Sequence, residues 1–116
     1  MVRRKEEAVV EKKKMFGGAG EAVMQKILNG ADEMYGKGRL FNYVTLEPGG
    51  EIAWHVHHGD GETYFILTGV GEYNDNGTIL NVYPGDTTFV DAEEGHSLKN
   101  VGEEPLTAIA LILYKD

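Results

Sequence analysis

The sequence contains no cysteine and only one tryptophan, and it has no long hydrophobic run. The absence of cysteine excludes disulfide bonds, a cysteine nucleophile, a zinc–thiolate site and an iron–sulfur cluster, and it suits a reducing compartment. No stretch is apolar enough to span a membrane, and the basic residues 1–5 are followed by charged residues instead of the apolar core of a signal peptide. We therefore expect a cytoplasmic protein without a membrane partner.

Basic residues are scarce outside the first 14 positions. The net charge is −8, from 11 Lys/Arg and 19 Asp/Glu. Residues 1–14 hold six of the basic and three of the acidic residues, so the remainder has five basic against sixteen acidic residues, a net charge of −11. A surface of that sign repels phosphate groups, so we expect no nucleic acid partner and favour small molecules or cations.

Glycine, in contrast, is abundant, with 16 among 116 residues. Because glycine permits tight turns and weakens helices, this composition predicts an all-β protein of one domain. We expect a charged and glycine-rich N-terminal segment over residues 1–20 and a single domain over residues 21–116. Disorder or partial order is the favoured prediction for residues 1–14, and a frayed helix or a tail docked on a partner subunit are the alternatives.

Strand signals become regular from Arg39 onward. Between them stand turn signals, of which the Asn76-Gly77 pair is the clearest sign of a hairpin. Residues 22–28 suit either a short helix or a strand, and this choice stays open. Short strands at this spacing, with no helix after Gly38, predict a closed β-sandwich or barrel. The expected strands are 40–46, 63–67, 71–73, 78–82, 87–90, 96–100 and 106–114.

Residues 49–69 contain three of the four histidines. In a strand His55 and His57 point to the same side, close enough to share one ion. If the Gly59-Asp60-Gly61 turn reverses the chain, Glu62 opens the returning strand beside them. Two imidazoles and a carboxylate suit a divalent metal, and a fourth ligand is expected elsewhere.

The spacing of these residues resembles the cupin superfamily. Its first motif, G-x5-H-x-H-x3-4-E-x6-G, is filled completely by Gly49, His55, His57, Glu62 and Gly69. Its second motif, G-x5-P-x-G-x2-H-x3-N, is matched at Gly85, His96 and Asn100, whereas Asp91 and Glu93 replace the proline and the glycine.

The resemblance implies a double-stranded β-helix, or jelly-roll barrel, over about residues 40–114. It also implies that His96 is the fourth metal ligand and that residues 22–28 form a strand, of the kind that small cupins often add to a partner's sheet. Such a site would hold one divalent transition metal, preferably Mn or Fe by family likeness, with Zn, Ni or Co as further candidates. Four protein ligands leave positions open for water, dioxygen or substrate. The short cupins described as oxalate decarboxylase-like or mannose-6-phosphate isomerase-like are similar.

Catalytic residues are harder to select. Tyr64 shares the face of Glu62 and is a candidate contact of a metal-bound ligand, or else a residue that fills the barrel. Arg39 is the only arginine outside the N-terminal segment, and it would bind a substrate carboxylate or phosphate if the face it shares with Phe41 and Tyr43 points inward. His58 is expected in an exposed loop. The carboxylates Asp60, Asp91, Glu93 and Glu94 are likewise expected in exposed loops.

Two classes of function follow. One is a metal-dependent enzyme of the decarboxylase, dioxygenase or isomerase type that acts on a dicarboxylate, a keto acid or a sugar derivative; the other is a non-catalytic, metal-anchored binding or sensing module. We also expect a homodimer, because four apolar residues lie on faces opposite the metal-binding residues, and we expect residues 16–28 to contribute to its interface. The four are Trp54, Val56, Phe65 and Leu67.

Overall fold

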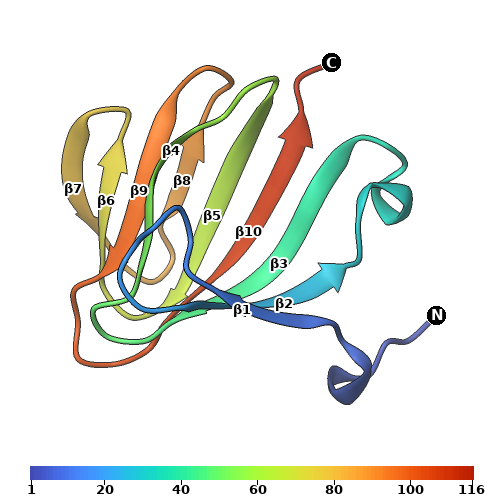
Figure 1. The fold of residues 1–116 in the computed structure, drawn as a ribbon, viewed down its shortest axis with the longest axis horizontal. Helices are drawn as coiled ribbons and strands as arrows, with labels where there is room; N and C mark the ends of the chain where they lie inside the picture. The colour runs from blue at the N-terminus through green and yellow to red at the C-terminus, as the bar shows by residue number, and fades with distance from the viewer.

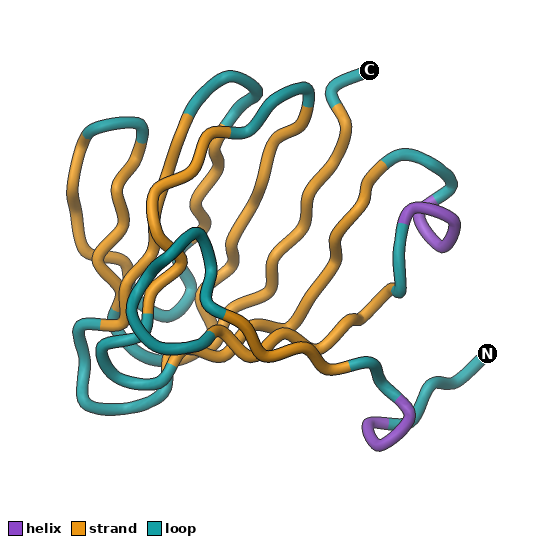
Figure 2. The backbone as a smooth tube through the Cα atoms, in the orientation of Figure 1, coloured by secondary structure: helices purple, strands orange, loops and turns teal.

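The computed structural model describes residues 1–116, whose regular secondary structure is almost entirely antiparallel strand (Figures 1 and 2). Two short 3-10 turns, η1 (Lys5–Glu7) and η2 (Ala31–Met34), are the only helical elements, and neither has the length or apolarity to cross a membrane. The all-β prediction is therefore confirmed. The strands are β1 (Val10–Lys13), β2 (Ala22–Leu28), β3 (Gly38–Leu46), β4 (Glu51–Val56), β5 (Asp60–Thr68), β6 (Gly71–Asp75), β7 (Thr78–Val82), β8 (Thr87–Val90), β9 (Gly95–Asn100) and β10 (Leu106–Tyr114).

The strands form two sheets that pack around one core. The larger sheet has the order β1-β2-β3-β10-β5-β8, and the smaller has the order β4-β9-β6-β7. Strands distant in sequence, such as β3 and β10, are neighbours, which gives the expected jelly-roll arrangement. Inward side chains of both sheets build the core: Ala22, Met24, Val44, Leu46, Ile52, Tyr64, Ile66, Tyr73, Val82, Leu98, Leu106, Ala108 and Ala110.

The hairpin between β6 and β7 confirms the turn prediction. Asn76 and Gly77 both have positive φ, 48° and 108°, as a two-residue hairpin turn of the primed type requires. This hairpin lies at the outer edge of the smaller sheet (Figure 1).

The N-terminal part of the chain is more ordered than the sequence suggests. Residues 10–13 form β1 and pair with β2, so the prediction of disorder is wrong for them. An edge strand needs backbone partners on one side only and leaves its polar side chains in solvent, which suits this charged stretch. Glu11 contacts Lys26 at 3.0 Å, and Arg3 makes two hydrogen bonds to the carboxylate of Glu33. The expected boundary at residue 20, between an N-terminal segment and the single domain, stays a prediction.

Residues 22–28 form a strand, which settles the choice left open above. This strand, β2, pairs with β3 of its own chain. Between β1 and β2 the chain leaves the larger sheet and runs along β4: Ala53 N donates to Met15 O at 3.2 Å, and Glu51 N donates to Ala19 O at 2.9 Å. Only glycine fits at Gly18, where a Cβ would lie 2.8 Å from the carbonyl oxygen of Glu51. This crossing places Phe16 over the interior of the barrel.

Candidate metal centre

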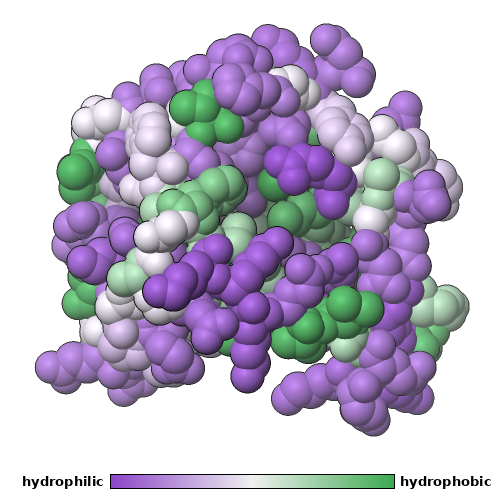
Figure 3. All heavy atoms as spheres, in the orientation of Figure 1, coloured by the Kyte–Doolittle hydropathy of each residue, from purple (hydrophilic) through white to green (hydrophobic).

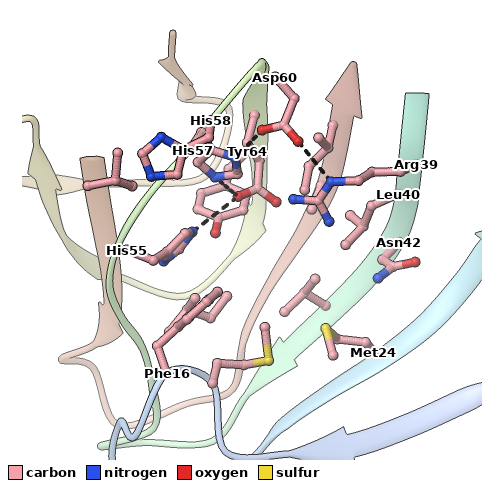
Figure 4. Close-up of a pocket in the computed structure, with 17 residues that line it drawn as sticks. Phe16, Met24, Arg39, Leu40, Asn42, His55, His57, His58, Asp60 and Tyr64 are labelled. Atoms are coloured by element: carbon pink, nitrogen blue, oxygen red, sulfur yellow. Dashed lines mark hydrogen bonds and ion pairs between the residues drawn. The ribbon is translucent and has the colours of Figure 1, made fainter. Parts of the chain in front are cut away.

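Four side chains converge inside the barrel, at the end where the chain passes from β4 to β5; Figure 4 labels two of them, His55 and His57. One ligand atom from each lies within 4.8 Å of all the others. The Nε2 of His96 is 3.0 Å from the Nε2 of His55, 3.2 Å from that of His57 and 3.0 Å from Oε1 of Glu62. These are the four residues selected by the two sequence motifs. We call them the four-ligand cluster: His55, His57, Glu62 and His96.

Strand pairing brings the four-ligand cluster together, but the position of Glu62 differs from the sequence expectation. β4 and β9 are neighbours, with His55 opposite His96. Glu62 does not return on a strand beside β4, because β5 belongs to the larger sheet. The chain crosses between sheets after His57, so Glu62 meets the histidines across the interior of the barrel.

Each imidazole is fixed through its Nδ1 atom. The Nδ1 of His55 lies 2.8 Å from the carbonyl oxygen of Ala53, and that of His57 lies 2.7 Å from Oδ1 of Asp60. The Nδ1 of His96 lies 2.7 Å from the hydroxyl of Tyr73. When each Nδ1 carries the proton and donates it to these oxygens, all three Nε2 atoms present lone pairs to the same point. This is the usual arrangement of metal-binding histidines.

The electrostatics of the cluster suit a cation. Burial by itself would raise the pKa of Glu62, but without a metal ion hydrogen bonds from protonated Nε2 atoms of the histidines outweigh burial and lower this pKa well below its usual value, so the carboxyl is ionised. Burial lowers the pKa of His96 and keeps that ring neutral, whereas hydrogen bonding to Glu62 raises the pKa of His57. Neutral Nε2 lone pairs about 3 Å apart repel one another unless a positive charge lies between them. Ligand atoms at 3.0–3.2 Å also fit an ion roughly 2.0–2.2 Å from each.

Asp60 was expected in an exposed loop, and this prediction is wrong. It is the first residue of β5 and only 5% exposed. Besides its contact with His57, its Oδ2 accepts a hydrogen bond from Nε of Arg39 at 2.8 Å. Burial opposes ionisation, but the hydrogen bonds from Arg39 and His57 lower the pKa of Asp60. The flanking glycines suggested a turn, and no sequence signal marked this aspartate as a partner of His57.

Arg39 reaches the cavity for a reason that strand alternation does not predict. Residues 41, 43 and 45 face away from the core, so the face that Arg39 was expected to share with Phe41 and Tyr43 does not point inward. However, β3 pairs Leu40 with Ile112 and Gly38 with Leu113, which leaves Arg39 as an extra residue in a bulge. A bulge re-aims the side chain. The guanidinium of Arg39 therefore lines the same cavity as the cluster (Figure 4).

Two tyrosines and a phenylalanine surround the cluster. Tyr64 faces the four-ligand cluster as expected, stacked on His96 with ring centroids 5.0 Å apart. Burial raises its pKa well above the usual value and keeps the phenol neutral. Tyr73 was missed, although alternation from Gly71 places it inward. Phe16 was also missed: it stacks on His55 at 4.0 Å, and nothing in its glycine-rich surroundings indicates this contact.

His58 is exposed, as expected, and its Nδ1 lies 2.8 Å from Oε2 of Glu93. Glu93 occupies the position where the second motif has glycine, and its φ of 69° is in the left-handed region that glycine prefers. Its side chain also accepts a hydrogen bond from Gly59 N at 3.2 Å, and its backbone N–H donates to the carbonyl oxygen of His57. These contacts hold the loop in place despite the substitution.

A cavity of about 350 Å³ opens beside the cluster. On the face shown in Figure 3, hydrophobic residues are visible between hydrophilic ones near the middle of the molecule. The cavity is lined by Met15, Phe16, Met24, Arg39, Leu40, Asn42, Val44, Ile52, His55, Val56, His57, His58, Asp60, Glu62, Tyr64, Ala110 and Ile112.

Comparison with known families and proteins agrees with this geometry. Residues 42–112 match the model of the cupin domain. An "oxalate-binding protein" of Thermotoga maritima is 39% identical over 114 residues, which are 97% of this chain and 93% of that protein.

Comparison with solved structures also supports the cupin fold. A crystal structure described as a "predicted oxalate decarboxylase" from Thermotoga maritima superposes with a TM-score of 0.92 at 38% identity and covers 98% of this chain and 99% of that one. An uncharacterised protein with a double-stranded β-helix domain from Klebsiella pneumoniae gives a TM-score of 0.70 at 23% identity, covering 89% of this chain and 85% of that one, and it supports the fold alone.

Proposed function

This chain belongs to the cupin domain family, and we propose that it holds one divalent transition-metal ion on the four-ligand cluster and binds a small carboxylate-bearing metabolite at that ion. The convergence of three Nε2 atoms and Oε1 of Glu62 within 4.8 Å carries the proposal. The name of the Thermotoga maritima relative supports a carboxylate as the ligand.

Nitrogen and oxygen ligands without sulfur suit Mn, Fe, Co, Ni or Zn, and family likeness favours Mn or Fe. A bound ion would supply Lewis acidity and polarise an oxygen of the ligand. The chain contributes the rest: Glu62 offsets one positive charge, the Nδ1 contacts fix the histidine rings, and Arg39 offers N–H donors to an anionic group.

The metal assignment is tested by paired histidine variants. His57→Ala removes a buried ligand and is expected to abolish most of the metal bound per chain after loading with Mn(II), measured by elemental analysis. His58→Ala removes the neighbouring exposed histidine and is the matched control, expected to bind as much metal as the wild type. Wild-type metal content in His57→Ala would show that the ligand assignment is wrong.

The open metal positions favour a metal-dependent enzyme of the decarboxylase, dioxygenase or isomerase type that acts on the bound metabolite. One observation favours a second candidate, a non-catalytic binding or sensing module. Both buried carboxylates of the cavity are engaged, Glu62 with the histidines and Asp60 with Arg39 and His57, and Tyr64 stays a neutral phenol. No free general base therefore lies beside the ligand position.

Turnover assays separate these two roles. Protein loaded with Mn(II) or Fe(II) is incubated in air with oxalate, 2-oxo acids, diketones and hexose phosphates, and products are followed by mass spectrometry. Metal-dependent product formation supports the enzyme. Metal-dependent binding without turnover across the panel supports the binding module.

A further inference from the structure

The cavity beside the four-ligand cluster has two chemically different ends. The histidines, Glu62, Asp60 and Arg39 form a polar end. The other walls are apolar: Figure 4 shows Met24 away from Asp60 and His57, Leu40 beside Arg39, and Phe16 below His55, on which it stacks. Side chains of β2, β3 and β4 and of the segment before β2 build the apolar end: Met15, Phe16, Met24, Leu40, Val44 and Ile52.

The size of the cavity exceeds what a minimal dicarboxylate needs. Its volume of about 350 Å³ falls in the range of roughly 300–1,000 Å³ that is typical of sites for larger organic ligands. Oxalate consists of two joined carboxylates, so it can occupy the polar end while the apolar end stays in contact with water. A ligand that also covers the apolar walls removes that surface from water and binds more tightly.

Two polar side chains at the boundary of the two ends have unused hydrogen-bonding groups. Only Nε of Arg39 is engaged, by Asp60, and its Nη1 and Nη2 have no protein partner. Asn42 is 5% exposed, lines the cavity next to Arg39 and Leu40, and its amide makes no hydrogen bond to the protein (Figure 4). Both residues line the same cavity as the cluster, so their free N–H groups can bind the carboxylate or the neighbouring oxygen of a ligand held there.

The charges at the polar end favour a single negative charge on the ligand. With a divalent ion bound, the two carboxylates contribute −2, the guanidinium +1 and the ion +2, which leaves +1 with neutral histidines. One carboxylate on the ligand balances this charge. A second carboxylate placed at the apolar end would be desolvated without a partner.

We propose that the ligand is a monocarboxylic acid with a neighbouring oxygen donor, such as a 2-oxo or 2-hydroxy acid, that carries an apolar group of several carbon atoms. The carboxylate and its neighbouring oxygen lie at the cluster, and the apolar group lies against Met24, Leu40 and Val44. This inference rests on the proposed metal site.

Calorimetric titration of the Mn(II)-loaded protein tests the ligand class. Pyruvate, 2-oxobutanoate and 4-methyl-2-oxopentanoate share one polar group and differ in apolar length. The dissociation constant is expected to fall by roughly tenfold or more from the first to the last, because each methylene in a fitting apolar pocket contributes on that scale. The matched control is 2-oxoglutarate, a chain of similar length that ends in a second carboxylate, and it is expected to bind no more tightly than pyruvate.

Variants at the apolar end test whether this part of the cavity contacts the apolar group of the ligand. Leu40→Trp fills this end, and Leu40→Ala removes part of its wall; each is expected to weaken binding of 4-methyl-2-oxopentanoate by roughly tenfold while leaving oxalate binding unchanged. The control is Leu113→Trp, a half-exposed position near the end of β10 that does not line the cavity, which is expected to change neither. Circular dichroism and metal content show whether each variant folds. If the tryptophan variant does not fold, the alanine variant still tests the inference.

The outcomes distinguish this inference from the proposed function. Equal affinities along the 2-oxo acid series, with metal-dependent binding of each, would overturn the apolar-ligand inference and leave the metal site standing. Absence of binding by every acid to the metal-loaded protein would overturn both. A loss of oxalate and 4-methyl-2-oxopentanoate binding by the same factor in Leu40→Ala would also overturn the inference.

Discussion

Asp60 links the only arginine of the cavity to a histidine of the four-ligand cluster. Its two oxygens lie 2.8 Å from Nε of Arg39 and 2.7 Å from Nδ1 of His57. A buried carboxylate in this position holds the proton on Nδ1 and makes Nε2 a stronger metal ligand. The arginine in turn stabilises the charge on the carboxylate, so the three side chains act as one unit.

Asp60→Asn tests this role at the residue scale. Asparagine keeps the shape and loses the charge, so metal affinity is expected to fall by roughly 10–100-fold while the fold remains intact. The measurement is competition with a fluorescent chelator. Glu103→Gln neutralises an exposed carboxylate outside the cavity and is expected to leave the affinity unchanged. An affinity within a factor of about two of wild type in Asp60→Asn would contradict the positioning role.

Two bulges decide which side chains of β3 and β4 face the interior. In β3 the extra residue is Arg39. In β4 the register shifts between Ile52 and His55, so both point inward although they are an odd number of residues apart. A bulge adds one residue to one strand and thereby changes the face that later residues occupy. The apolar wall of the cavity and the wall that carries His55 can for this reason share one strand.

Stepwise truncation separates two roles of the N-terminal segment. Removal of residues 1–14 deletes β1 and its pairing with β2, and a loss of about 1 kcal/mol would lower the melting temperature by roughly 4–8 °C. Metal affinity is expected to stay the same. Removal of residues 1–20 also deletes Phe16 and the contacts to β4, so His55 is less well held and metal affinity is expected to fall as well. Equal metal affinity in both truncations would show that Phe16 does not support the site.

The pH dependence of stability belongs to the whole molecule, because metal binding and folding are coupled. Without metal, hydrogen bonding to Glu62 raises the pKa of His57 above 6.5. The protonated ring then adds stability that is fully present below the unfolded value and is lost as pH rises through the folded value. Metal binding requires the neutral ring, so its contribution to stability changes in the opposite direction.

We therefore expect the melting temperatures with Mn(II) and with chelator to differ strongly near about pH 7.5 and to converge near about pH 5. Differential scanning fluorimetry at the two pH values measures this difference. His58→Ala removes a histidine outside the cluster, serves as the control and is expected to behave as wild type. A difference of the same size at both values would show that histidine protonation does not control metal occupancy.

The exposed apolar side chains predict that the protein is a homodimer. The four apolar residues named in the sequence analysis remain exposed in the single chain, but they lie on two sheets: Trp54 on β4 and Phe65 on β5. On the outer face of the larger sheet, aromatic and aliphatic side chains continue across neighbouring strands, where Phe65 and Tyr43 flank Ile109. A homodimer through this face would cover it.

Sedimentation at micromolar concentration is expected to give twice the chain mass of 12.8 kDa. Phe65→Glu is expected to shift the protein to the monomer, and Ile79→Glu on the exposed edge strand β7 is expected not to. A wild-type monomer would contradict the proposal. The participation of residues 16–28 in the interface stays a prediction.

The sequence by itself determined the strand content, most strand positions and the composition of the four-ligand cluster. Alternation at the end of β4 places His55 and His57, the residue just after this strand, on one side, and the likeness of the two sequence motifs to those of cupins added His96. Local rules suffice for the strands and turns, since a strand's period and a turn's φ angles are set by neighbouring residues.

Only the tertiary structure decided which other residues surround the four-ligand cluster. Asp60 is buried because β5 crosses to the opposite sheet, Arg39 enters the cavity because of a register shift against β10, and Phe16 reaches His55 because residues 15–19 run along β4. β1 is ordered because an unpaired edge of β2 is available to it. Each of these contacts joins segments far apart in the sequence, so no local pattern encodes it, and pairing across the completed barrel creates it.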